Sequence, residues 1–160
     1  MQKVTILCTG KLKEKFYLDA VAEYVKRLSR FCKLEIIELP EERLPEDPSP
    51  AQIEAALSKE ADAVRAKLPN GCLVIAMCVE GRERSSEELA RYLADSAAQG
   101  ASHIVFLIGS SFGMHESLKR QAALRLSMSP MTFPHHLLRV MLLEQVYRAF
   151  KINEGSSYHK

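Results

Sequence analysis

The stretch that decides the fold is His103-Ile104-Val105-Phe106-Leu107-Ile108, which runs directly into Gly109-Ser110-Ser111-Phe112-Gly113. From Ile104 onward the first segment is apolar at every position, with no polar residue in alternation. Such a run is typical of a parallel strand that is buried on both faces of a sheet. The second segment, bounded by glycines, predicts a turn, and a helix over about Glu116–Ala123 follows it.

The same strand, turn and helix pattern repeats on both sides of this stretch. Strands that alternate with helices favour a parallel sheet covered by helices on both faces, because each crossover helix packs against the sheet. At 160 residues the chain has the length of one domain. We therefore predict an α/β fold in a single domain, residues 1–160, with strands at Val4–Cys8, Leu34–Leu39, Leu73–Val79, His103–Ile108 and Arg125–Met128.

Helix starts are marked by their capping residues. Ser49 precedes Pro50 and has Gln52 three residues on, and Ser85 stands in the same relation to Glu88. Both patterns predict a capping box, in which the two side chains satisfy free backbone N–H groups.

The last predicted helix opens at Pro134 and extends to about Lys151. Leu138 and Leu142 follow one stripe, yet Leu143 and other residues off the stripe are apolar too. A helix with so broad an apolar surface must be covered on two sides. We expect the sheet on one side and a second subunit on the other, giving a homodimer through the C-terminal helix. The alternative is that its own chain covers it completely.

Composition excludes several classes of protein. The chain is 47% hydrophobic and 26% charged, as in ordinary globular domains. Its apolar runs are far shorter than the roughly 18 residues of a membrane span, and the N-terminus lacks a signal region. We expect a cytoplasmic protein with no membrane partner. The four cysteines form no C-x-x-C pair and are predicted to be small core residues. His135 and His136 are expected on different faces of a helix, so no metal site is predicted.

Charge is unevenly distributed along the chain. Residues 11–33 carry seven basic and three acidic side chains, residues 34–62 carry two basic and nine acidic, and residues 119–160 carry seven basic and two acidic. Two basic ends around an acidic middle indicate a polyanionic partner on one side of the molecule. Solvated helix faces are the alternative explanation.

The loops that follow the later strands indicate where a ligand binds. In open parallel sheets, ligands bind beyond the carboxyl ends of the strands. The first strand is followed by neither G-x-G-x-x-G nor a P-loop, which disfavours a Rossmann dinucleotide site and an ATPase site. Glycines follow the third and fourth strands instead, and residues 129–134 follow the fifth. These three loops are expected to hold a flat, mostly uncharged group such as an adenine ring; ordinary strand-end turns are the alternative.

Several longer motifs are specific to one family. They are Gly10-Lys11-Leu12-Lys13-Glu14-Lys15, Phe106-Leu107-Ile108-Gly109, Ser127–His135, Arg139-Val140, Glu144–Ala149 and the terminal Tyr158-His159-Lys160. Together they resemble the large-subunit rRNA pseudouridine methyltransferases of the SPOUT superfamily, over the whole length of the chain.

The resemblance implies a C-terminal part threaded into a deep trefoil knot, a homodimer, and S-adenosylmethionine as methyl donor. It implies that the acceptor is N3 of a pseudouridine in helix 69 of 23S rRNA, within the assembled ribosome. The family usually has a second glycine where this chain has Ser110, which predicts a more restricted backbone in that loop. Carried over residue by residue, the donor contacts fall at Met77, Gly109, Met128, Ser129, Pro130, Met131, Thr132 and Phe133.

Methyl transfer to an imide nitrogen requires alignment of the two reactants and removal of the N3 proton. The resemblance does not fix the base, and His135, Glu144, Tyr158 and His159 are all candidates. Tyr158 is also suited to stack on the target base. Arg139 is a candidate for neutralising an RNA phosphate or the donor carboxylate, or else a surface charge of the last helix.

Basic residues near both ends are candidate RNA contacts. Lys11, Lys13 and Lys15 form a basic loop suited to phosphate, which ammonium groups neutralise without distinguishing the base sequence. Arg148 is a further candidate, although Glu144 one turn away is an alternative partner for it.

Two other functions are compatible with most of these sequence features. One is a SPOUT methyltransferase that acts on tRNA, although no RNA-binding domain is appended to the chain. The other is a ribosome-binding factor that keeps the fold without the activity.

Overall fold

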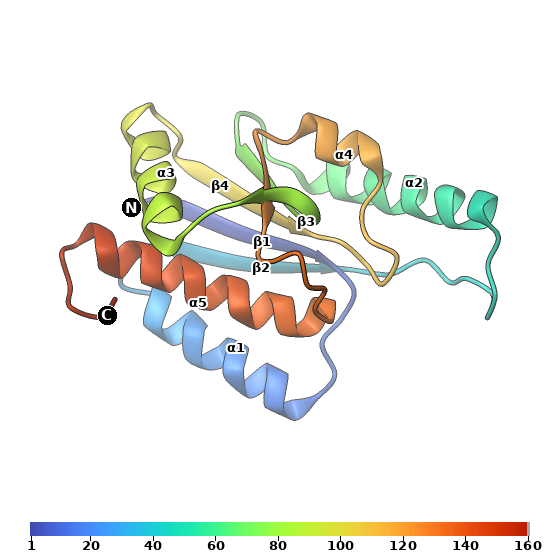
Figure 1. The fold of residues 1–160 in the computed structure, drawn as a ribbon, viewed down its shortest axis with the longest axis horizontal. Helices are drawn as coiled ribbons and strands as arrows, with labels where there is room; N and C mark the ends of the chain where they lie inside the picture. The colour runs from blue at the N-terminus through green and yellow to red at the C-terminus, as the bar shows by residue number, and fades with distance from the viewer. Residues whose placement is uncertain (160) are drawn as a thin grey trace.

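The computed structural model describes residues 1–159 and shows a single five-stranded sheet in which all pairings are parallel (Figure 1). The strand order is β2-β1-β4-β3-β5, so the stretch quoted above forms β4 near the centre of the sheet. The predicted α/β class is confirmed. The strands are β1 (Lys3–Thr9), β2 (Lys33–Leu39), β3 (Leu73–Glu83), β4 (His103–Ile108) and β5 (Leu124–Ser127).

Helices cover both faces of the sheet. In Figure 1, α1, α3 and α5 lie on one face, and α2 and α4 lie on the other. The central strand supplies both cores, because successive side chains of a strand point to opposite faces. Phe106 packs in the core under α1, α3 and α5, and Leu107 packs in the core under α2 and α4. The helices are α1 (Lys15–Leu28), α2 (Pro50–Lys67), α3 (Ser86–Ala98), α4 (Glu116–Gln121) and α5 (His135–Asn153).

Both predicted capping boxes are present. The Ser49 hydroxyl accepts the Gln52 N–H at 3.2 Å, and the Gln52 side chain accepts the Ser49 N–H at 2.8 Å. The same reciprocal pair joins Ser85 and Glu88, at 3.1 and 3.3 Å. These local signals fix the starts of α2 and α3.

The ends of β3 and α4 differ from the predicted ends, because backbone groups there pair with neighbouring strands. β3 continues past the predicted end at Val79 to Glu83, after a register shift against β5. A Cβ on Gly81 would lie 2.9 Å from the carbonyl carbon of Leu126, so glycine permits this close passage. α4 ends two residues earlier than predicted, because the Ala123 N–H donates to Val74 O at 2.8 Å and joins the sheet edge.

The broad apolar surface of α5 is covered largely by its own chain. α5 lies between α1 and α3 and packs against both (Figure 1). Leu142, Leu143 and Val146 are fully buried in this layer. The breadth of the apolar surface therefore does not require a second subunit, and dimerisation stays a prediction.

Two of the four free cysteines lie in the core, as predicted. Burial raises the pKa of Cys8 to about 12 and that of Cys32 to about 11, so both remain neutral thiols at pH 7. Cys72 and Cys78 are half-buried. Within residues 1–159, no group of three His, Cys, Asp or Glu side chains is placed to hold a metal ion. None of the five helices that the structure describes is long and apolar enough to cross a membrane.

Candidate functional site

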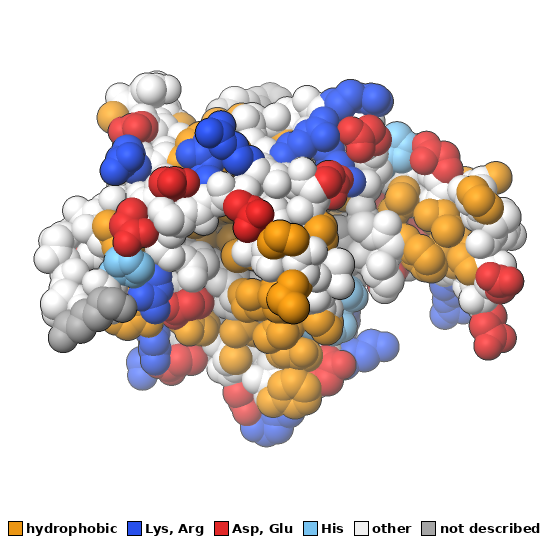
Figure 2. Space-filling model, viewed as in Figure 1, with side chains coloured by type: hydrophobic (Ala, Val, Ile, Leu, Met, Phe, Trp, Pro, Cys, Tyr) orange, Lys and Arg blue, Asp and Glu red, His pale blue; other side chains and the backbone are white. Residues whose placement is uncertain are grey.

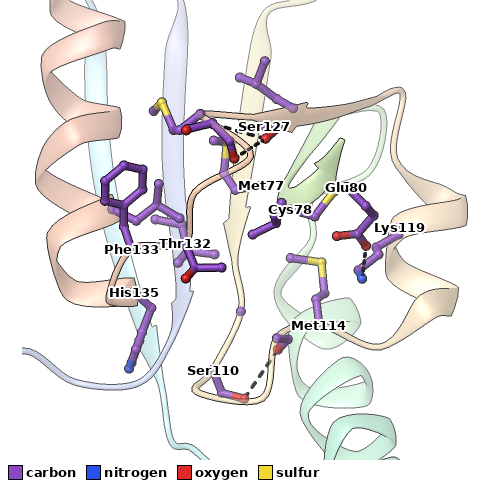
Figure 3. Close-up of a pocket in the computed structure, with 18 of the residues that line it drawn as sticks. Met77, Cys78, Glu80, Ser110, Met114, Lys119, Ser127, Thr132, Phe133 and His135 are labelled. Atoms are coloured by element: carbon purple, nitrogen blue, oxygen red, sulfur yellow. Dashed lines mark hydrogen bonds and ion pairs between the residues drawn. The ribbon is translucent and has the colours of Figure 1, made fainter. Parts of the chain in front are cut away.

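A cavity of about 360 Å³ opens at the carboxyl end of the sheet (Figure 3). It is built by the second half of β3, by the loops that follow β4 and β5, and by the first turns of α5. The loop predicted after the third strand, at Glu80-Gly81, is part of β3 in the structure. The size of the cavity falls in the range of small-molecule sites. Residues that line it include Met77–Glu80, Ile108–Met114, Lys119, Leu126–Ser129, Met131–Phe133, His135 and Leu138.

Seven of the eight residues predicted to contact a methyl donor line this cavity. Met77 comes from β3, Gly109 from the loop after β4, and Met128, Ser129, Met131, Thr132 and Phe133 from the loop after β5. Pro130 is exposed and lies outside the lining. The deep part of the wall is apolar, formed by residues such as Ile108, Leu126 and Leu138. A slot of this kind suits the flat, uncharged ring expected from the sequence.

Gly109 is required by the loop itself. A Cβ at this position would overlap the carbonyl oxygen of Gly113 and lie 2.6 Å from its carbonyl carbon. The loop closes on itself there, because Ser110 and Gly113 exchange backbone hydrogen bonds at 3.0 and 2.9 Å. Glycine at this position therefore makes room for the returning backbone of its own turn.

Ser110 fits its position without strain. The positive φ angles in this loop are confined to Gly113, at 91°, so Ser110 has an ordinary backbone conformation. The serine is buried and forms the bridge to Gly113. The loop therefore accommodates a serine at position 110.

Serine hydroxyls shape the loop after β5. The Ser127 hydroxyl donates to Ser129 O at 3.0 Å, and the Ser129 hydroxyl accepts the Met131 N–H at 3.0 Å. These local bonds replace secondary structure in the turn. The turn leaves Met131 and Phe133 exposed, at 74% and 36% of their surface.

His135 is the one base candidate that lines the cavity (Figure 3). Burial, and then the neighbouring His136, lower the pKa of its imidazole, so the ring is neutral at pH 7. The two histidine rings lie 4.2 Å apart, but only His135 lines the cavity, whereas His136 faces Glu14 at 3.5 Å. His135 also packs against Gly10, where a Cβ would come within 3.1 Å of the ring.

Arg139 is buried and does not line the cavity. Its guanidinium donates to Glu38 Oε2 at 2.6 Å and to Gly10 O at 3.2 Å. Glu38 also accepts the Leu12 N–H at 2.9 Å. Burial opposes ionisation of Glu38, but the bonds from Arg139 and Leu12 outweigh it and lower the pKa of the carboxyl. Arg139 thus ties α5 to the loop after β1, and its charge is already matched.

The other base candidates gather around the middle of α5, at Glu144, and in the segment that follows the helix. Tyr158 donates to Glu144 at 3.1 Å, and Arg148 donates to the same carboxylate at 2.8 Å. His159 lies 3.1 Å from Arg148 and 2.6 Å from Glu87. Glu144 is nine residues from His135, or roughly 13 Å along the helix. We call Glu144, Arg148, Tyr158 and His159 the tail cluster. None of these four residues lines the cavity, and Lys160 lies outside the described residues.

The basic loop remains exposed. Lys11 and Lys13 project from the segment between β1 and α1. Lys15, at the start of α1, pairs with Asp19 at 2.7 Å on its own helix. Arg148 pairs with Glu144, the alternative foreseen from their spacing.

An ion pair on one wall of the cavity was not predicted from the sequence. Lys119 donates to Glu80, opposite Phe133 and His135 in Figure 3. The two residues are 39 positions apart, and no local pattern connects them.

Comparison with known proteins agrees with this architecture. A family model described as "Predicted SPOUT methyltransferase" matches residues 2–159. A protein of Streptococcus uberis named "Ribosomal RNA large subunit methyltransferase H" is 48% identical over 158 residues, which cover 99% of each chain. Proteins of the same name from Streptococcus suis and Lactobacillus delbrueckii are each 45% identical, over 158 and 157 residues. The chain therefore belongs to the SPOUT methyltransferase family.

Proposed function

We propose that this protein methylates large-subunit rRNA, with S-adenosylmethionine as donor. The finer assignment, N3 of a pseudouridine in helix 69 of 23S rRNA within the assembled ribosome, follows the resemblance, as do the trefoil knot and action in the cytoplasm. One observation carries the proposal. The cavity at the carboxyl end of the sheet gathers seven of the eight residues assigned to the donor, in a chain whose relatives are named as rRNA methyltransferases.

The residues present fit this donor. The apolar inner wall suits an adenine ring, and a cavity of about 360 Å³ suits a ligand of this size. When bound, the donor supplies a methyl group that is already electrophilic through its sulfonium centre. The remaining tasks of the protein are to hold the donor, to orient the acceptor and to receive a proton.

His135 is the residue best placed to receive the N3 proton. It lines the cavity, and its lowered pKa keeps the imidazole in the proton-accepting form at pH 7. The loops after β4 and β5 hold the donor beside it. Lys11 and Lys13 then contact RNA phosphates from the loop that Arg139 and Glu38 hold in place.

The tail cluster acts at the cavity of a second copy of the chain. Within one chain Glu144 lies roughly 13 Å along α5 from His135, and none of the four residues lines that chain's own cavity. Figure 2 shows hydrophobic side chains gathered over α1 and the segment that leads from β5 into α5. Phe16, Leu18, Met131 and Phe133 are exposed in these segments. An exposed apolar patch beside the cavity supports a homodimer that includes α5.

Calorimetry and a transfer assay test the proposal. We expect saturable binding of S-adenosylmethionine, and transfer of labelled methyl to assembled ribosomes but not to protein-free 23S rRNA. Label in tRNA would favour the tRNA methyltransferase instead. Absence of binding would favour the non-catalytic ribosome-binding factor. Mass spectrometry of the labelled rRNA then locates the modified base.

A further inference from the structure

A buried carboxylate contacts the loop 109–113 on the side away from the cavity. Glu60, on α2, is 7% exposed although it is ionisable. Its Oε1 accepts the Ser110 hydroxyl at 2.7 Å, and its Oε2 accepts the Glu42 N–H at 2.9 Å. Both carboxylate oxygens of Glu60 therefore have hydrogen-bond partners. One of these partners, Ser110, belongs to the loop that lines the cavity.

A second carboxylate binds the next residue of the same loop. The Ser111 N–H donates to Glu41 Oε1 at 3.0 Å. Two acidic residues, one from α2 and one from the segment after β2, thus hold consecutive positions of the turn from outside. Gly109 and Gly113 have no side chains. The loop bonds to α2 through the Ser110 hydroxyl, which donates to Glu60.

A void between α2 and the loop 109–113 shows why the hydrogen bond between Glu60 and Ser110 matters. A small void of about 10 Å³ separates α2 from the loop and is lined by Glu60, Gly109 and Gly113, among others. Without the Glu60 side chain this void would enlarge, and the turn would be free to move backward, away from the cavity. Displacing a binding loop by about 1 Å is enough to lose much of a ligand's alignment.

We propose that Glu60 is a positioning residue for the methyl donor, and that it acts by holding the Ser110 hydroxyl and thereby the loop 109–113 against the cavity. The inference rests on the proposed function for the identity of the ligand. The attachment of the loop is a property of the free protein and does not depend on that identity.

The test compares two single variants and their combination. Glu60→Ala and Ser110→Ala each remove one side of the hydrogen bond, and we expect each to weaken donor binding about tenfold, the worth of one such bond to a charged group. We expect the double variant to bind S-adenosylmethionine about as tightly as whichever single variant has the lower affinity, because both changes break the same hydrogen bond. Glu60→Gln retains an acceptor for Glu42 and a donor for the Ser110 oxygen, and should restore affinity to within a few-fold of the wild type.

The matched control is Thr5→Val. Thr5 is buried at the opposite end of the sheet, with its hydroxyl 2.7 Å from His103 Nε2. This variant also loses a buried hydrogen bond, so it reports the effect of lower stability alone. All affinities are measured by calorimetry well below each melting temperature. Equal donor affinity in the wild type, Glu60→Ala and Ser110→Ala would overturn the inference, as would an equal loss in Thr5→Val.

Amide hydrogen exchange separates this inference from the proposed function. In the free protein, exchange at residues 110–113 should accelerate in Glu60→Ala and Ser110→Ala but not in Thr5→Val. Unchanged exchange would refute the attachment of the loop. A wild-type protein that does not bind S-adenosylmethionine, yet shows this exchange pattern, would refute the proposed function and leave Glu60 as the residue that holds the loop.

Discussion

Gly109→Ala is the smallest change that should disable the cavity. The added methyl group would lie 2.6 Å from the carbonyl carbon of Gly113 and 3.1 Å from Met114 N. Real Cβ atoms essentially never come closer than 3.0 Å, and ordinary contact begins at 3.4 Å. The returning backbone must therefore move by somewhat less than about 1 Å, and the mutual hydrogen bonds between Ser110 and Gly113 must stretch.

The expected loss follows from these distances. Two weakened backbone hydrogen bonds cost about 1 kcal/mol each, and a loop displaced on this scale loses contact with a bound ring. We expect the dissociation constant for S-adenosylmethionine to rise between about 10-fold and 100-fold. Calorimetry gives this value directly, and thermal unfolding of the same preparation shows whether the fold persists.

Gly71→Ala is the matched control for this experiment. Unlike Gly109, Gly71 has a positive φ, at 74°, and a Cβ there would meet no atom within 4 Å. The control therefore introduces backbone strain without a clash, and it lies outside the cavity lining. It should lower stability by about 1 kcal/mol and leave donor binding unchanged. Wild-type affinity in Gly109→Ala would refute the close approach on which the reasoning depends.

Three further changes test other parts of the site. The transfer rate should rise with pH through a pKa below 6.5, because neutral His135 is the active form; His135→Asn should remove this step and lower the rate at least 100-fold, and an unaltered pH–rate profile would exclude His135 as the base. Deleting residues 158–160 should leave donor binding intact by calorimetry and reduce methyl transfer, whereas full transfer by the shortened chain would exclude the tail from the reaction. Arg139→Met should lower the free energy of unfolding in urea by about 2–3 kcal/mol, less than for a fully buried pair because Glu38 is one-third exposed; an unchanged urea midpoint would show that the pair does not hold the loop after β1.

Local patterns were sufficient to predict most of the fold. The bounds of β4 agree with the prediction at both ends. An uninterrupted apolar run between two polar segments fits a strand that is buried on both faces of a parallel sheet, so its two ends mark the ends of the strand. The starts of α2 and α3 agree because a capping box involves four consecutive residues. The end of α4 was wrong by two residues, since it depends on a bond from Ala123 to Val74, 49 positions earlier.

The broad apolar surface of α5 shows a limit of another kind. Hydrophobic periodicity indicates how much of a helix is buried but not which molecule buries it. α1 and α3 supply most of that cover, and they come from distant parts of the same chain. A second copy of the chain would give the same pattern in the sequence, so the pattern alone could not separate the two explanations.

The residues predicted to bind a donor come together in one cavity where their placement depends on strand ends, whereas the paired charges around that cavity were not predicted. The loops after β4 and β5 meet beside β3 because parallel strands end at one edge of the sheet. Arg139 bonds to Gly10 across 129 positions, Glu60 to Ser110 across 50, and Glu41 to Ser111 across 70. The charge distribution identified residues 34–62 as an acidic segment between two basic ends, and nothing in the sequence placed its carboxylates at the site. In the structure, Glu38, Glu41 and Glu60 of that segment accept hydrogen bonds from loops at the ligand-binding edge, so part of its charge holds the cavity in shape.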